Sequence, residues 1–172
     1  MIVIGIDPGT VQSAYVVFDG AQVLDHGIAP NPKVAAFLRT ADPAGSAVAF
    51  EKIEGMGMTV GREVFETIHW TGRFYQVARD TIGPKRVFRI PRTAVKLQLC
   101  RSRRAKDPHI RRALLNRFGG PKAQGSRSLP GPLFGITSHE WSALAVAVTW
   151  WDTDRKAFER NQQEKVHATA VV

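Results

Sequence analysis

Residues 2–7 read Ile-Val-Ile-Gly-Ile-Asp and lead directly into Pro8-Gly9-Thr10. The stretch is apolar on both faces until its last position, which is typical of a strand in the middle of a sheet. The proline and glycine that follow predict a turn. Because side chains alternate along a strand, Gly5 and Asp7 share one face. The sequence therefore predicts a central strand that ends in a carboxylate beside a small residue.

The rest of the chain predicts strands and helices around this strand. Asp19-Gly20 separates two short apolar runs, which favours a hairpin and an antiparallel three-stranded meander. Hydrophobic periodicity and turn residues predict strands at 46–51 and 86–90, and helices at 32–39, 60–82, 107–118 and 137–151. Such an order favours an α/β sheet with helices packed on its faces. We expect one domain, residues 1–154, followed by a polar tail, 155–172.

Charge is distributed unevenly along the 172 residues. The chain carries a formal net charge of +9, and residues 84–128 hold 14 bases against one acid, Asp107. A basic segment of this density favours a polyanion partner such as nucleic acid, with a merely solvated basic surface as the alternative. The single cysteine, Cys100, excludes an internal disulfide and a four-cysteine zinc site, and it favours a reducing, intracellular location. No membrane span or secretory signal is expected.

Two acids close predicted buried strands. Asp7 ends the first strand and Glu51 ends the strand at 46–51, each with small residues on its own face. Buried carboxylates brought together repel each other unless a cation or a proton intervenes, and a divalent metal with oxygen ligands satisfies both. The alternative for each acid is a turn or cap residue. On the last predicted helix, His139 and Ser142 share a face, whereas the spacing of Thr137 and Glu140 is that of a capping box.

Four segments together resemble the RuvC-type Holliday-junction resolvases of the RNase H-like superfamily, especially their short phage- and prophage-type members. The segments are IGIDPGT (4–10), AFEKIEGMGMTVGREVFETIHWTGRF (49–74), KDPHIRRALLNRFGG (106–120) and GITSHEWSALAVAVTW (135–150). They run in the order of the family and span nearly the whole chain. The resemblance implies an RNase H-like mixed sheet, an antiparallel meander plus parallel strands, flanked by helices.

The resemblance also implies an activity and a site. It implies a homodimeric endonuclease that resolves four-way and other branched DNA junctions, in DNA recombination and repair, by phosphodiester hydrolysis with two Mg²⁺ or Mn²⁺ ions. The catalytic positions fall on Asp7, Glu51, His139 and Ser142, and the first three would be metal ligands. Ser142 stands where the family commonly has aspartate. The departure predicts weak binding of the second ion, unless Glu140 or water completes its ligands, and on this reading Ser142→Asp would lower the metal requirement.

The remaining implications concern partners and location. Branched DNA and a second copy of the chain would be the partners, and no small-molecule cofactor and no membrane are expected. The helix from Val60 would form the dimer contact, and the Gly-Met-Gly-Met turn at 55–58 could lie near the branch point or simply pack as a loop. The chain would act in the cytoplasm of a bacterial host, encoded by a phage or prophage. The phosphate-binding residues would be Arg92, Lys96, Arg101, Arg103, Arg104, Lys106, Arg111 and Arg112.

Three other interpretations stay open at this stage. The turn at residues 7–10 also resembles the phosphate-contacting turn of actin-like ATPases, but 172 residues leave no room for their two lobes. A ribonuclease H that cuts RNA–DNA hybrids would share the fold and the metal chemistry, and cleavage of a hybrid rather than a four-way junction would identify it. Because Ser142 replaces an acid, a junction-binding protein with weak or no catalysis is the third.

Overall fold

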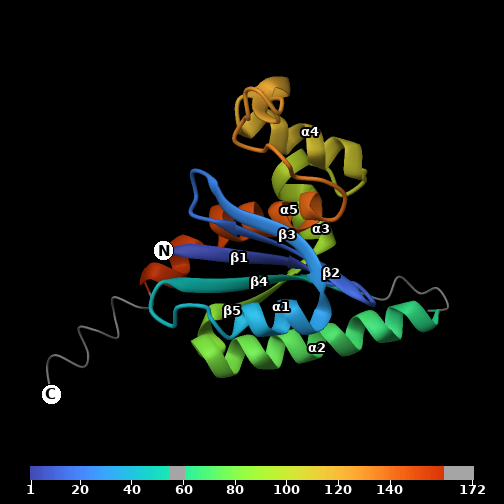
Figure 1. Cartoon of the computed structure of the whole chain (residues 1–172), viewed down its shortest axis with the longest axis vertical. Helices are drawn as coiled ribbons and strands as arrows, with labels where there is room; N and C mark the ends of the chain where they lie inside the picture. The colour runs from blue at the N-terminus through green and yellow to red at the C-terminus, as the bar shows by residue number, and fades with distance from the viewer. Residues whose placement is uncertain (55–60, 161–172) are drawn as a thin grey trace, which may run out of the picture.

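A single five-stranded sheet organises the computed structural model, which describes residues 1–54 and 61–160 (Figure 1). The strands are β1 (Ile2–Asp7), β2 (Gln12–Phe18), β3 (Val23–Pro30), β4 (Ser46–Lys52) and β5 (Val87–Pro91). The helices are α1 (Asn31–Leu38), α2 (Arg62–Ile82), α3 (Arg92–Cys100), α4 (Asp107–Arg117) and α5 (Glu140–Thr153), with short 3-10 turns η1 (Pro84–Arg86) and η2 (Gly120–Ala123).

The sheet is mixed, and its order is β3-β2-β1-β4-β5. β1, β2 and β3 form an antiparallel meander, whereas β4 runs parallel to both β1 and β5. The register pairs Ile6 with Phe50, so Asp7 and Glu51 follow the last paired positions of two adjacent parallel strands. The predicted fold class, a meander plus parallel strands flanked by helices, is confirmed.

Helices cover both faces of the sheet. α1 and α2 lie on one face, where Ile4, Ile6 and Phe50 pack against Phe74 and neighbouring apolar side chains (Figure 1). α5 lies on the other face and is buried along nearly its whole length, because it is apolar on all sides. α4 and the loop after it stand beyond α3 and α5 at the top of Figure 1. None of the helices in the described part of the chain is long and apolar enough to span a membrane.

Some boundaries differ from the sequence-based expectations. The nine-residue helix α3 was not predicted, because its apolar residues Val95, Leu97 and Leu99 alternate and give no helical stripe. α5 begins at Glu140, three residues later than predicted. The predicted start of the long helix at Val60, the turn at 55–58 and residues 161–172 of the predicted tail lie outside the described residues. Residues 155–160 are helical, and Phe158 among them is buried against Phe88 and Trp150.

The packing of α5 on β1 depends on Gly5. A Cβ placed on Gly5 would lie 2.3 Å from the carbonyl oxygen of Ala143 and 2.8 Å from the Cβ of Ala147. The helix backbone therefore rests directly on the strand, with only alanines between them. Since His139 and Ser142 stand at the start of the same helix, this contact determines how far they lie from Asp7.

Gly5→Ala is expected to destabilise the fold by about 1 to 3 kcal/mol, because the added methyl group would meet helix backbone that cannot move aside easily. Urea unfolding followed by circular dichroism measures the loss. Gly72→Ala is the matched control: no heavy atom lies within 4 Å of its added Cβ, and it should gain about 0.5 to 1 kcal/mol as a helical glycine. A Gly5→Ala protein as stable as its parent would contradict the close-packed contact.

Candidate active site

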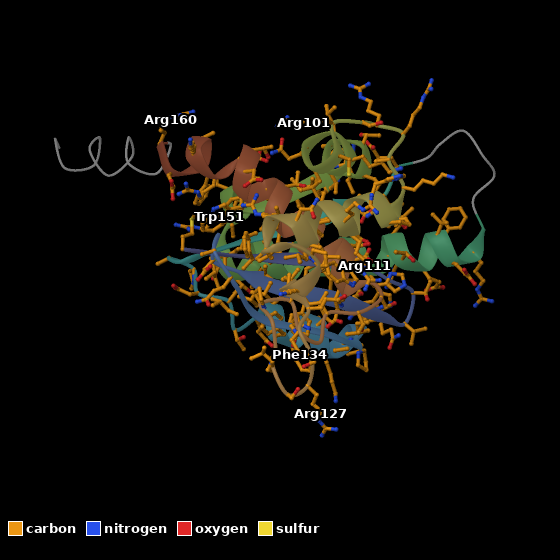
Figure 2. All side chains as sticks on the ribbon, turned by 90° about the horizontal axis from the view of Figure 1, so that it is seen from above. Arg101, Arg111, Arg127, Phe134, Trp151 and Arg160 are labelled. Carbon is orange, nitrogen blue, oxygen red and sulfur yellow. The ribbon has the colours of Figure 1, made fainter. Side chains whose placement is uncertain are left out.

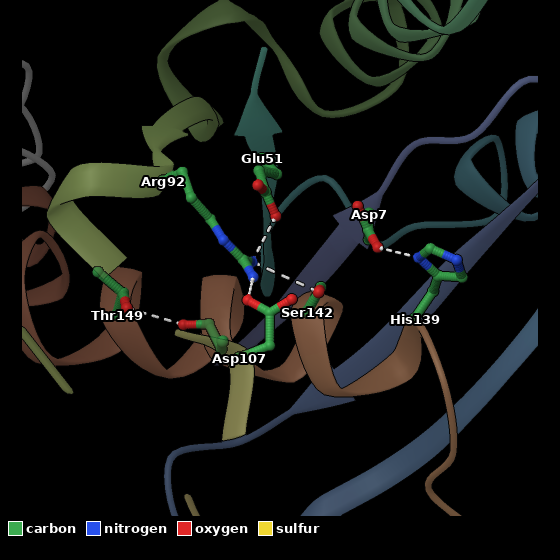
Figure 3. A network of polar contacts seen from close by, with 8 residues as sticks. Asp7, Glu51, Arg92, Asp107, His139, Ser142 and Thr149 are labelled. Carbon is green, nitrogen blue, oxygen red and sulfur yellow. Dashed lines mark hydrogen bonds and ion pairs between the residues drawn. The ribbon is translucent and has the colours of Figure 1, made fainter. Parts of the chain in front are cut away.

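The candidate site lies where the carboxyl ends of three parallel strands meet the beginning of α5. Asp7 ends β1, Glu51 stands near the end of β4, and Arg92 follows the end of β5 as the first residue of α3. His139 caps α5 and Ser142 lies in its first turn. Residues 7, 51, 139 and 142, predicted from the sequence as one site, are therefore brought to one edge of the sheet (Figure 3).

Asp7 and His139 form the first half of the site. Oδ2 of Asp7 lies 3.0 Å from Nδ1 of His139, a hydrogen-bonded pair. The two side chains differ in exposure, since that of His139 is 73 % exposed and that of Asp7 only 15 %. Burial raises the pKa of Asp7 above its usual value, and the neighbouring imidazole limits that rise. The pair thus presents a carboxylate from the protein interior and a solvent-facing imidazole side by side.

Glu51, Arg92, Asp107 and Ser142 form the second half (Figure 3). Nη1 of Arg92 donates to Oε2 of Glu51 at 3.0 Å and to Oγ of Ser142 at 3.4 Å. Nη2 of the same guanidinium donates to Oδ1 of Asp107, the first residue of α4. The guanidinium therefore lies between two carboxylates and the serine hydroxyl.

Burial dominates the electrostatics of Glu51. Its side chain is 18 % exposed, and desolvation raises its pKa to about 7. The Arg92 guanidinium opposes this rise and the Asp7 carboxylate adds to it. At neutral pH this carboxyl is therefore partly protonated, whereas an ordinary surface glutamate is ionised.

A separate contact fixes the beginning of α5. The buried carboxylate of Glu140 accepts hydrogen bonds from the backbone N–H of Thr137 at 2.7 Å and from its hydroxyl at 3.0 Å. Its other oxygen lies 2.7 Å from Nδ1 of His26 on β3. Of the two roles that the sequence left open for Glu140, the structure shows the contact with Thr137, although the N-cap residue of α5 is His139 and not Thr137. One carboxylate oxygen makes this contact and the other is engaged by His26. The same contacts hold the turn that carries His139.

A cleft of about 770 Å³ opens beside the first half of the site. Asp7 and His139 lie in its wall together with the turn between β1 and β2. The first turns of α2 also line the cleft, through Glu63, Val64 and Thr67. A ligand that entered the cleft would thus meet the Asp7–His139 pair directly.

The basic residues predicted to bind phosphate lie around α3 and α4. Six of the eight are exposed, whereas Lys96 is half-buried and Arg92 is held by the two carboxylates. The guanidinium of Arg111 stacks over the Trp141 ring at 4.9 Å. Figure 2 shows Arg101 and Arg127 at opposite ends of the view with Arg111 between them, so basic side chains extend across this side of the molecule. The exposed six are Arg101, Arg103, Arg104, Lys106, Arg111 and Arg112.

The two halves of the site differ in how they fit a divalent ion. Among residues 1–54 and 61–160, no three His, Cys, Asp or Glu side chains form a ready metal cluster. Asp7 and His139 place two donors side by side, which fits one ion whose other ligands are water or phosphate. Glu51 and Ser142 do not fit a second ion, because the Arg92 guanidinium already contacts both.

The order of strands and the position of the site define an RNase H-like fold, which the comparison with solved structures supports. The "Thermus thermophilus RuvC structure" aligns with a TM-score of 0.64 and 19 % identity over 95 % of this chain and 97 % of that one. "T. thermophilus RuvC in complex with Holliday junction substrate" gives 0.61 and 20 % over 87 % and 92 %. The chain therefore has a RuvC-like fold. No protein-family model and no curated sequence matches it.

The sequence predicted residues 7, 51, 139 and 142 as one site but not the contacts between their side chains. It assigned Arg92 to phosphate binding, whereas the structure pairs this residue with Glu51 and Asp107. Asp107 was missed as part of the site. The signal that could have found it is its isolation, because it is the one acid among the 14 bases of residues 84–128.

The raised pKa of Glu51 predicts a pH-dependent stability. Between the ordinary pKa of 4.5 and the folded value of about 7, the folded state binds more protons than the unfolded state. Stability is therefore lost as pH rises through this window, by up to about 3 kcal/mol for this group. Glu51→Gln removes the titration, so its stability relative to the parent should increase from pH 5 to pH 8.

Urea unfolding of both proteins in EDTA, at pH 5 and pH 8, measures this difference without a metal contribution. Glu54→Gln is the control, since Glu54 is exposed and, within residues 1–54 and 61–160, pairs with Lys52 alone. An equal difference between Glu51→Gln and its parent at the two pH values would show that Glu51 titrates as an ordinary carboxyl.

Proposed function

We propose that the protein is a structure-selective endonuclease that cuts four-way and other branched DNA junctions by metal-dependent phosphodiester hydrolysis. The observation that carries the proposal is the Asp7–His139 pair at the wall of the cleft, at the carboxyl edge of a RuvC-like sheet. The solved structure of a protein of this fold with a Holliday junction substrate supports the choice of DNA. So does the basic surface around α3 and α4.

Each half of the site has a role in this proposal. Asp7 and His139 would hold one Mg²⁺ or Mn²⁺ ion. When bound, such an ion activates water and stabilises the charge that develops on the phosphate. Glu51, with a pKa of about 7, can accept a proton at neutral pH. The exposed bases of α4 and of the loop before it would hold the phosphates on either side of the cut and keep the strand in place.

A junction-binding protein with weak or no catalysis is the second candidate. Ser142 favours it, because a hydroxyl replaces the carboxylate that the resemblance places there and is a weak metal ligand. Binding of four-way junctions without Mg²⁺- or Mn²⁺-dependent nicking would select this candidate. A phage- or prophage-type origin and a cytoplasmic location stay predictions from the sequence.

We further propose that α2 forms a homodimer contact. The helix has 21 residues, yet its buried residues are Phe74, Ala78 and Ile82, all in its second half. In its first half, Phe65 and Ile68 are 60 % and 48 % exposed and lie three residues apart, on one face. Exposed apolar side chains gathered on one helix face are typical of an interface, and a twofold pair of sites suits a four-way junction.

Asp7→Asn is expected to reduce junction nicking at least about 100-fold, because a neutral amide binds a divalent ion poorly and cannot orient His139 as a carboxylate does. Junction binding should persist or strengthen, since a charge that repels phosphate is removed. A nicking assay on immobile and mobile four-way junctions with Mg²⁺ or Mn²⁺, paired with a gel-shift assay, measures both. Asp80→Asn, a charge-matched change on α2, should cut like the parent. Parental cutting by Asp7→Asn would refute the site assignment.

Ile68→Glu is expected to weaken self-association roughly 30-fold or more, as the loss of a central apolar contact does in an interface. Analytical ultracentrifugation across micromolar concentrations measures the monomer–dimer equilibrium. Phe134→Glu, which puts the same acid on an exposed apolar position of the loop before α5, should leave the equilibrium unchanged. A parent chain that sediments as a monomer, alone and with DNA, would reject this contact.

A further inference from the structure

We propose that Arg92 is a fixed cation of the active site and takes the place of the second divalent ion expected there. The inference rests on the proposed nuclease function and deepens it. On this proposal a bound divalent ion at Asp7 and His139 supplies one positive charge of the site, and the Arg92 guanidinium supplies the other.

The first observation is the position of the Arg92 guanidinium. Arg92 opens α3 directly after β5, so its side chain starts at the same edge of the sheet as Asp7 and Glu51. Nη1 contacts Glu51 and Ser142, the two residues on which a second ion would depend for ligands. The side chain is 24 % exposed. A cation is therefore already present between the donors that a second ion would need.

The second observation is the pairing of Arg92 with Asp107. Nη2 donates to this aspartate while Nη1 is bound to Glu51, so the planar guanidinium is held at both of its ends. Hydrogen bonds to a carboxyl group at each end keep the guanidinium in place against solvent. Asp107 is itself exposed and starts α4, so the arrangement ties the basic helix to the site.

Electrostatic repulsion also disfavours a second ion beside Arg92. A second divalent ion in this place would lie in contact with a positive guanidinium, and its protein ligands would be reduced to a paired glutamate and a hydroxyl. Ser142→Asp alone would give Arg92 another carboxylate instead of creating an ion site. The sequence-based expectation that this single change lowers the metal requirement is therefore revised: the arginine has to leave as well.

Counting bound Mn²⁺ by electron paramagnetic resonance on the full-length chain tests the inference without turnover. The double variant Arg92→Met/Ser142→Asp should bind one more ion per chain than the parent. Arg89→Met/Ser142→Asp is the charge-matched control, because Arg89 stacks on Tyr75 and has no carboxylate partner among the described residues. The control and the Ser142→Asp single variant should bind the same number as the parent.

Three results would overturn the inference. They are an Arg92→Met/Ser142→Asp protein with no additional ion, a second ion in the Ser142→Asp protein, and a second ion in the parent. Arg92→Gln/Ser142→Asp, which keeps a hydrogen-bond donor near Glu51, provides the same count if the methionine variant does not fold. An added ion in a chain whose parent nicks no junction would support the role of Arg92 and refute the proposed nuclease function, so the two failures are distinguishable.

Discussion

The direct contact between α5 and β1 at Gly5 is the constraint on which the rest of the structure depends. With hydrogen in place of a side chain, the strand lets the helix backbone approach until the carbonyl of Ala143 nearly touches it. His139 and Ser142 then stand within reach of the residues at the strand ends. A thicker layer between helix and strand would move the imidazole away from Asp7, and close-packed interiors do not absorb such a shift. The absence of a Cβ at Gly5 thus determines the geometry of the site.

The balance of charge is the second property that shapes the site. Burial favours the neutral forms of Asp7 and Glu51, while His139 and Arg92 favour the charged forms. In the first half, an imidazole that faces solvent stabilises the charged form of Asp7. In the second half, a guanidinium that is also paired with Asp107 stabilises the charged form of Glu51. Charges in such a partly dry environment act on each other more strongly than they would in water. A cation added beside these carboxyl groups would therefore lower the pKa of both.

The sequence was sufficient to predict the sheet and the identity of the acids at its edge. Apolar runs such as residues 2–7 and 46–51 specify buried strands by composition alone, and the acids that close them stand out. The pairing of Arg92 with Asp107 could not be predicted in this way. It depends on the first residues of α3 and α4, which are 15 positions apart in the sequence, lying side by side near Glu51 of β4. In addition, α3 carries no helical stripe of apolar residues. Local patterns do not contain that tertiary arrangement.

The first turns of α2 carry both cleft-lining residues and exposed apolar residues between positions 64 and 68. Val64 and Thr67 line the cleft beside Asp7 and His139, whereas Phe65 and Ile68 are 60 % and 48 % exposed. Under the proposed function, a partner that displaced these turns on binding Phe65 and Ile68 would change the width of the cleft, and by thermodynamic reciprocity a DNA strand in the cleft would change the affinity for that partner by the same factor.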